Sequence, residues 1–155
     1  MKILYHHRIA SKDGQYVHIS EIVRALENEG HVVTVVGPET TESSEFGHDG
    51  GFVTKLKEKL PLFVYELMEF GYNAIVAIKL FRSIKSFKPD VIYERYNLHQ
   101  PAGVFISKKM KVPLILEVNA PLKEEREAFG KGLAMPRFAK AVENYTWKNA
   151  DAVLP

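Results

Sequence analysis

The chain has 155 residues, of which 46% are hydrophobic and 26% charged, and its formal net charge is +2. A net charge this small gives no support for a nucleic-acid-binding surface, and the absence of cysteine excludes disulfides and thiolate metal sites. No apolar run approaches the roughly 18 residues of a membrane-spanning helix. Because the N-terminus also lacks a signal-peptide core, we expect one soluble, cytoplasmic globular domain.

The N-terminal part predicts a β–α–β unit. An apolar strand over residues 2–7 is followed by a loop over 8–16, a helix over 17–30 and a β-branched strand over 31–37. The helical stripe consists of Ile19, Ile22, Val23 and Leu26. The second strand is almost wholly apolar, which is typical of a strand covered on both faces. The two strands are expected to be parallel, with a right-handed crossover.

The middle of the chain is irregular before it becomes helical. Residues 38–51 lack periodicity and predict a loop, with a short strand over 52–54. Residues 55–88 have a helical pattern, but Pro61 and Gly71 interrupt it. We therefore expect two or three helical segments instead of one.

From residue 89 onward, short apolar strands again alternate with helices. The expected elements are a strand over 90–94, a helix over 100–111, a strand over 113–119, a charged loop over 120–136, a helix over 137–150 and a strand over 151–155. This alternation predicts a doubly wound α/β fold with a parallel sheet. Because the last strand ends with the chain, we interpret the sequence as a truncated part of a longer protein.

In such sheets, ligands bind at the carboxyl ends of the strands. Gly14, after the first strand, is either a turn that needs a positive φ or a close backbone contact to a ligand at the positive end of a helix. The dinucleotide fingerprint G-x-G-x-x-G and the P-loop G-x-x-x-x-G-K are both absent. Their absence counts against nicotinamide cofactors and P-loop nucleotides.

The stretch "YERYNLHQ" follows the third strand and is rich in polar and aromatic groups. Arg95 could bind a phosphate, Tyr96 could stack on a sugar or lipid carbon, and His99 could orient or deprotonate a hydroxyl. The alternative is structural. In that interpretation Glu94 and Arg95 pair with neighbours, and His99 caps the helix that starts near Pro101.

The stretch "EVNAPLKEER" follows the fourth strand. Glu117 lies in a strand that is predicted to be buried, where a charge needs a partner, and Arg95 and Arg126 are the candidates. Arg126 is also a candidate substrate contact. Asn119 could bind a sugar hydroxyl, or it could form an Asx-type turn into Pro121.

Histidines also raise the question of a metal site. His6 and His7 end the first strand and could meet His99, but no histidine or carboxylate stands nearby at helical ligand spacing. We therefore predict hydrogen-bonded histidines and no metal.

The segments "MKILYHHRIASKDGQYVHISEIVRALENEGHVVTVVGP", "KPDVIYERYNLHQPAGVFISKKMKVPLILEVNAPLKEER" and "VENYTWKNADAVLP" together resemble the N-terminal half of family-4 glycosyltransferases of the GT-B class. The resemblance implies a Rossmann-like, acceptor-side domain of a two-domain retaining enzyme. It implies a glycan or lipid-linked acceptor, and a nucleotide-sugar co-substrate held by the other domain, with no metal or further cofactor. It also implies that the leaving diphosphate is stabilised electrostatically.

The resemblance also assigns positions in this sequence. Gly14, Gln15 and Tyr16 match the family's loop near the acceptor and donor phosphates. Glu94, Arg95 and Tyr96 match a strand tip where many members have an acceptor-contacting histidine, and His99, a candidate catalytic residue, stands farther on. Asn119 replaces a histidine that many members have.

Two further expectations concern surfaces. The cations Lys79, Arg82 and Lys85 occur near the aromatic residues Phe63, Tyr65, Phe70 and Tyr72. This mixture would suit peripheral contact with an anionic membrane; the alternative is that the cations form ordinary solvated helix faces. Sheet surface exposed by truncation would favour self-association. The alternative to an enzyme domain is a non-enzymatic binding module with a flavodoxin-like or receiver-like sheet.

Overall fold

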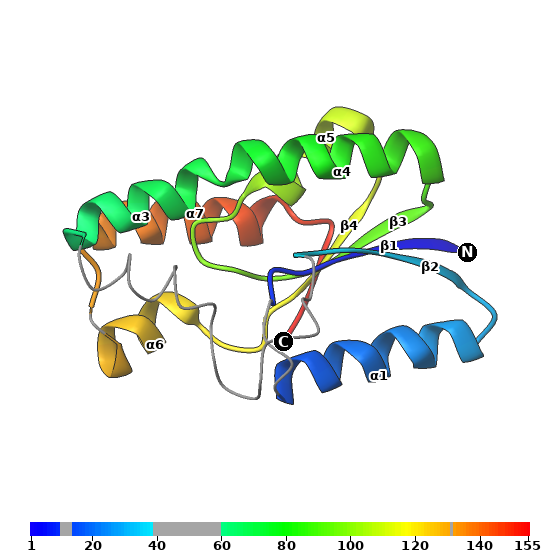
Figure 1. Cartoon of the computed structure of the whole chain (residues 1–155), viewed down its shortest axis with the longest axis horizontal. Helices are drawn as coiled ribbons and strands as arrows, with labels where there is room; N and C mark the ends of the chain where they lie inside the picture. Colours follow the sequence, from blue (N-terminus) through cyan, green and yellow to red (C-terminus); the bar gives the residue numbers. More distant parts are fainter. Residues whose placement is uncertain (10–13, 39–59, 131) are drawn as a thin grey trace.

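A computed structural model describes residues 1–9, 14–38, 60–130 and 132–155. Within these residues the chain forms a five-stranded sheet with helices on both faces (Figure 1). In chain order the elements are β1 (Lys2–His6), α1 (Gly14–Asn28), β2 (Val32–Val36), α3 (Leu62–Gly71), α4 (Asn73–Phe87), β3 (Val91–Arg95), α5 (Ala102–Met110), β4 (Leu114–Glu117), α6 (Leu122–Phe129), α7 (Pro136–Asn149) and β5 (Ala152–Leu154).

All neighbouring strands are parallel, and their order is β2-β1-β3-β4-β5. The chain runs outward from β1 to the edge strand β2 and then crosses back to β3 on the other side of β1. The order therefore reverses between β1 and β3, and the carboxyl ends of these strands flank the place where open α/β sheets bind ligands. The predicted doubly wound, Rossmann-like fold is confirmed.

The main core lies between the sheet and the helices α4 and α5. Leu4, Leu80, Ile92, Val104 and Leu116 are fully buried there. Helix α1 lies on the opposite side of the sheet from α4 (Figure 1). Ile19 is the buried residue of α1, and the rest of its predicted stripe is half-buried.

Two predictions about the elements are wrong. The edge strand β2 is not covered on both faces, because Val32 and Val35 are 57% and 46% exposed. Residues 122–129 form helix α6 instead of a loop. This helix has no buried residue, so the sequence carries no apolar stripe that would reveal it. The predicted strand over 52–54 lies outside the described residues.

The predicted break in the long helical region is confirmed. Pro61 precedes α3, and Tyr72, which has helical dihedral angles, joins α3 to α4. Lys88 ends α4 with a left-handed φ of 52°. None of the helices in the described part of the chain is long and apolar enough to cross a bilayer.

Candidate functional site

A hollow of about 320 Å³ opens at the carboxyl ends of β3 and β4, beside the N-terminus of α1. We call it the strand-end hollow. Its lining residues are Ile9, Gln15, Arg95, Tyr96, Asn97, Asn119, Ala120, Leu122 and Glu125. The tertiary structure thus brings together Gln15, Arg95, Tyr96 and Asn119, which the sequence predicts as site residues from three separate segments.

The segment after β1 is more helical than predicted. Helix α1 begins at Gly14, and Gly14 does not have a positive φ, so the turn interpretation of this glycine is wrong. Gln15 lines the strand-end hollow, whereas Tyr16 lines a second hollow between α1 and β2. The first turn of α1 therefore faces two separate spaces.

Glu117, at the end of β4, organises the polar side chains beside the strand-end hollow. It is 5% exposed, and its Oε1 lies 3.4 Å from Arg95 Nη1 and 3.1 Å from His18 Nε2. The same oxygen accepts a hydrogen bond of 2.5 Å from Asn119 Nδ2. The Tyr5 hydroxyl donates to Oε2 at 3.3 Å. Of the two predicted partners of Glu117, Arg95 is confirmed.

This carboxylate also affects the tyrosines beneath it. Burial, followed by the charge of Glu117, raises the pKa of Tyr93 to about 12. The same two causes raise the pKa of Tyr5, whose ring stacks on Tyr93 at a centroid distance of 5.1 Å. Both phenols therefore stay protonated at neutral pH and can only donate or accept as neutral groups.

Tyr96 contributes to the wall of the hollow, but it is 6% exposed. Its hydroxyl donates to Glu143 Oε1 at 3.0 Å, and its ring packs edge-on against Trp147 with a centroid distance of 5.6 Å. Burial and the Glu143 charge raise its pKa. These contacts fix the ring within the protein, so the expectation that its face stacks on a ligand is not supported.

Glu94 lies on the other side of the sheet from Arg95, because successive side chains of a strand point to opposite faces. Its Oε2 is 2.6 Å from Nδ1 of His6, and both side chains are buried. A side chain at Gly103 in α5 would overlap the Glu94 carboxylate. Glu94 therefore pairs with a neighbour, as the structural alternative proposed, and does not line the strand-end hollow.

His99 is fully buried and has a left-handed φ of 61°. Its ring stacks on Phe138 at 5.9 Å, and neither ring nitrogen has a hydrogen-bond partner among the described residues. Burial lowers its pKa. The predicted cap is not His99, because the Asn73 side chain accepts from the N–H of Ala102 at 3.1 Å. His99 also lies outside the strand-end hollow.

Arg126 has a different partner from the one proposed for it. Its guanidinium forms two hydrogen bonds to Glu69, with Nη1–Oε2 and Nη2–Oε1 distances of 2.7 and 3.2 Å. These two hydrogen bonds connect α6 to α3. Arg126 is not among the residues that line the strand-end hollow, so its predicted substrate contact stays a prediction without support from its position.

His7 directly follows β1 and contacts both the loop after β1 and Gly37. Ile9 donates its N–H to His7 Nδ1 at 3.1 Å, so this nitrogen is an acceptor. Burial, with smaller effects of His6 and Arg95, lowers the pKa of His7 to about 4. His7 is therefore neutral at physiological pH, and its Nε2 carries the proton.

Among the described residues there is no group of three or more His, Cys, Asp or Glu side chains that could hold a metal ion. His6 pairs with Glu94, His7 bonds to Ile9, and His99 packs on Phe138. The three histidines thus have separate surroundings.

The sequence analysis assigned no role in the site to several residues around the hollow. These are Tyr5, Ile9, His18, Asn97, Leu122 and Glu125. His18 carried a usable signal, since it stands four positions after Gly14 and so lies on the same helix face. Leu122 and Glu125 belong to α6. Because the sequence predicted a loop there, the position of these two residues beside the hollow was not predicted.

Comparison with known proteins gives a family and several related folds. The glycosyl transferase 4-like domain family matches residues 13–155. UDP-GlcNAc 2-epimerase from Neisseria meningitidis, bound to UDP-GlcNAc, has 12% identity and a TM-score of 0.55 over 99% of this chain and 39% of that one. The Methanocaldococcus jannaschii UDP-GlcNAc 2-epimerase in complex with UDP-GlcNAc and UDP has 18% identity and a TM-score of 0.52 over 94% and 38%.

These structural similarities establish the fold, and the chain spans about two fifths of the length of the two solved structures. No curated protein matches the sequence significantly. The match to the glycosyl transferase family covers most of the chain, and this leaves the flavodoxin-like or receiver-like alternative without support.

Proposed function

Because the chain belongs to the glycosyl transferase 4-like domain family, we propose that it is the acceptor-binding domain of a retaining glycosyltransferase. In this proposal the parent enzyme moves a sugar from a nucleotide-sugar donor to a glycan or a lipid-linked acceptor. The acceptor occupies the strand-end hollow, with its reacting hydroxyl directed away from the sheet.

The observation that carries the proposal is the chemistry of the hollow. Three side-chain amides, those of Gln15, Asn97 and Asn119, line it. An amide offers both a donor and an acceptor, as a sugar hydroxyl does. Such a lining can recognise several hydroxyl groups without requiring a charged ligand.

The charge balance supports a neutral ligand. Arg95 is the cation among the lining residues, and the buried carboxylate of Glu117 lies 3.4 Å from its Nη1. Glu125 adds a negative charge at the rim. Since Arg95 is already paired, the hollow is better suited to the hydroxyl-rich part of an acceptor than to a phosphate. This revises the expectation that Arg95 binds a phosphate.

The donor side belongs to a second domain in this proposal. That domain would hold the nucleotide sugar and would supply the groups that stabilise the leaving diphosphate. The acceptor domain contributes orientation, which alone accounts for a large part of catalysis when two substrates must meet. No metal or further cofactor takes part.

The proposal is tested in a polypeptide that joins this domain to the donor-binding domain that the proposal requires. Asn119→Ala removes one amide from the hollow, so we expect the KM for the acceptor to rise about tenfold with the donor KM unchanged. Initial rates are measured as nucleoside diphosphate released from UDP-, GDP- and dTDP-sugars in the presence of glycan and lipid-linked acceptors. The matched control is Asn144→Ala, on the exposed side of α7. An unchanged acceptor KM would show that the acceptor does not bind in the strand-end hollow. An absence of transfer from every donor would refute the proposed function.

A further inference from the structure

The outward face of α3 and α4 is apolar although it faces solvent. Its large hydrophobic side chains are each 48–53% exposed, namely Phe63, Leu67, Met68, Ile75 and Ile78. A helix on the surface of a soluble protein normally turns its polar residues outward. This face therefore needs a physical explanation.

The acidic residues of α3 explain part of this inversion. Glu66 is fully buried and accepts hydrogen bonds from the N–H groups of Ala134 and Met135 at 2.6 and 3.0 Å. Glu69 is also buried and pairs with Arg126. Both carboxylates thus face the interior and make stabilising contacts there. The apolar side chains on the other face of the same helix are therefore exposed to solvent.

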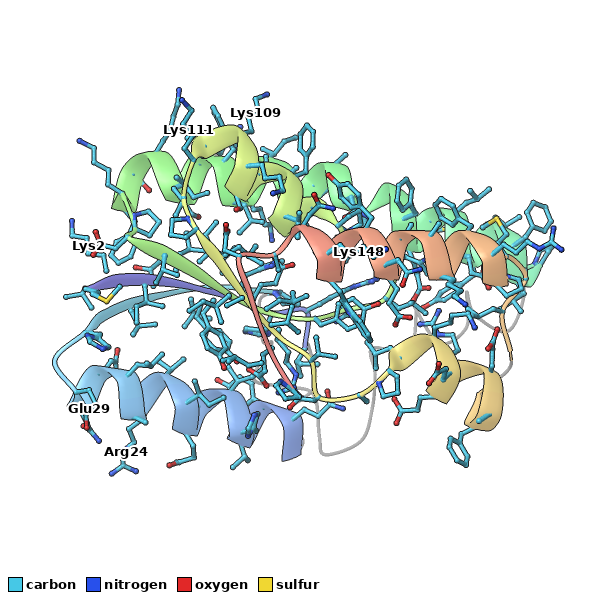
Figure 2. The ribbon with its side chains drawn as sticks, turned by 180° about the vertical axis from the view of Figure 1, so that it is seen from behind. Lys2, Arg24, Glu29, Lys109, Lys111 and Lys148 are labelled. Atoms are coloured by element: carbon cyan, nitrogen blue, oxygen red, sulfur yellow. The ribbon has the colours of Figure 1, made fainter. Side chains whose placement is uncertain are left out.

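A group of cations continues this face. Lys79, Arg82 and Lys85 are exposed on α4, and α5, which packs beside α4, adds Lys108 and Lys109. Lys111 directly follows the last residue of α5, and Phe105 of α5 is 56% exposed. Neither α4 nor α5 contains an aspartate or glutamate. Figure 2 shows Lys109 and Lys111 pointing away from the sheet, opposite the side where Arg24 lies on α1.

We propose that the exposed side chains of α3, α4 and α5 form a docking surface for an anionic lipid leaflet, which we call the α3–α5 face. The apolar side chains would enter the boundary between headgroups and acyl chains, and the cations would contact lipid phosphates. This inference stands independently of the proposed sugar transfer.

The shape and composition of the α3–α5 face favour a membrane over a protein partner. Helices α3 and α4 run end to end along one side of the molecule (Figure 1), and their 10 and 15 residues extend about 38 Å at about 1.5 Å per residue. A protein interface depletes lysine at its core, whereas an interfacial helix combines lysine and arginine with Phe and Leu. The positive charge of α4 and α5, which contain no acidic residue, is complementary to acidic lipid.

The structure also corrects which aromatic residues can take part. Of the four aromatic residues that the sequence suggested, Phe63 is exposed, but Tyr65, Phe70 and Tyr72 are only half-buried side chains with contacts inside the protein. Phe70 packs edge-on against Phe138 at 5.0 Å, and the Tyr72 ring lies 5.2 Å from the Arg8 guanidinium. Aliphatic residues therefore supply most of the insertion surface.

The test is co-sedimentation of this chain with phosphatidylcholine vesicles that contain or lack phosphatidylglycerol, at low and high salt. We expect binding to the anionic vesicles, weakened by salt because exposed charges are screened. Arg82→Glu with Lys109→Glu should reduce the partition coefficient at least about 25-fold, at about fivefold for each cation. Leu67→Ser with Ile78→Ser should reduce it about tenfold.

Matched controls lie on the other side of the sheet. Arg24→Glu and Val17→Ser are the same kinds of change at exposed positions of α1, and they should leave vesicle binding unchanged. Equal losses in the controls, or unchanged binding in the α3–α5 variants, would overturn the proposal. The proposal would also be overturned if the unchanged chain did not bind anionic vesicles. If that chain instead formed a dimer that Leu67→Ser with Ile78→Ser disrupts, the face would belong to a second copy.

Discussion

Glu117 is buried at the end of β4 and contacts side chains from β1, α1, β3 and the loop after β4. A buried carboxylate is costly unless it is paired and hydrogen-bonded. Here it balances the charge of Arg95 and holds the amide of Asn119. One residue that does not itself line the strand-end hollow thus sets both the charge and the geometry of two residues that do.

Glu117→Gln tests this role directly. The substitution keeps the shape but leaves the guanidinium of Arg95, whose side chain is 11% exposed, without its counter-charge. We expect the free energy of unfolding to fall by about 3 kcal/mol, as when one partner of a buried pair is removed. Urea unfolding followed by circular dichroism measures the change.

The matched control for this substitution is Glu29→Gln, since Glu29 is exposed near the end of α1 (Figure 2). It should change the stability by less than about 0.5 kcal/mol. Equal stability of Glu117→Gln and the unchanged chain would mean that the carboxylate charge has no structural role.

Among the secondary-structure elements, α3 anchors the C-terminal part of the fold. Glu69 binds Arg126 of α6, and Glu66 accepts two backbone N–H groups at the start of α7. The second contact places a carboxylate at the positive end of α7, where a negative charge is favourable. Helix α6 has no fully buried residue, and the Arg126 contact adds to the packing of its partly buried Leu122 against the core.

The Glu69–Arg126 contact predicts a pH dependence of stability. Burial alone would raise the pKa of Glu69, but the hydrogen bonds and charge of Arg126 lower it below its ordinary value of 4.5. Because the folded-state pKa is the lower one, ionised Glu69 stabilises the fold above about pH 4.5, and this stabilisation disappears as the pH falls through the folded-state pKa.

Glu69→Gln should therefore reduce the free energy of unfolding by about 2 kcal/mol at neutral pH, and by progressively less as the pH falls below the ordinary carboxyl pKa. Urea titrations over a series of pH values would show the two curves converging in acid. Glu124→Gln, at an exposed position of α6, should give a curve parallel to that of the unchanged chain. A constant difference between Glu69→Gln and the unchanged chain would contradict the assignment.

For the whole molecule, the two sides of the sheet differ in character. The α4 and α5 side buries an apolar core, whereas the α1 side holds the Tyr5, Arg95 and Glu117 contacts. The strand-end hollow opens on the polar side. The two edge strands, β2 and β5, carry exposed valines and Leu154, and self-association through them stays a prediction.

The proposed function assigns donor binding to a second domain, and it therefore predicts that this chain alone does not catalyse transfer. In the proposed function the groups that hold the donor and stabilise its leaving diphosphate lie elsewhere. We therefore expect no nucleoside diphosphate release above the uncatalysed rate when residues 1–155 are incubated with UDP- or GDP-sugars and acceptors. A polypeptide that joins this domain to the donor-binding domain of the proposed function provides the positive control. Turnover by the isolated chain would show that this domain contains a donor site.

The sequence alone predicted the α/β alternation, because each buried strand is a short apolar run and each long helix has an apolar stripe. It also predicted a site at the carboxyl ends of the parallel strands, and the strand-end hollow lies there, lined by residues that follow β1, β3 and β4. The family resemblance was confirmed by the match to residues 13–155. The α/β alternation and the position of the site follow from the order of short sequence patterns, and each pattern is contained in a few neighbouring residues.

Only the tertiary structure decided which polar residues reach the hollow. Glu94 and Arg95 are adjacent in sequence, yet strand alternation sends one to His6 and the other to Glu117. His99 was expected at the site, but a left-handed φ and Phe138 place its ring in the interior. Burial and pairing depend on residues distant in the chain, such as the partner of Arg126 on α3, and a single sequence does not specify those distances.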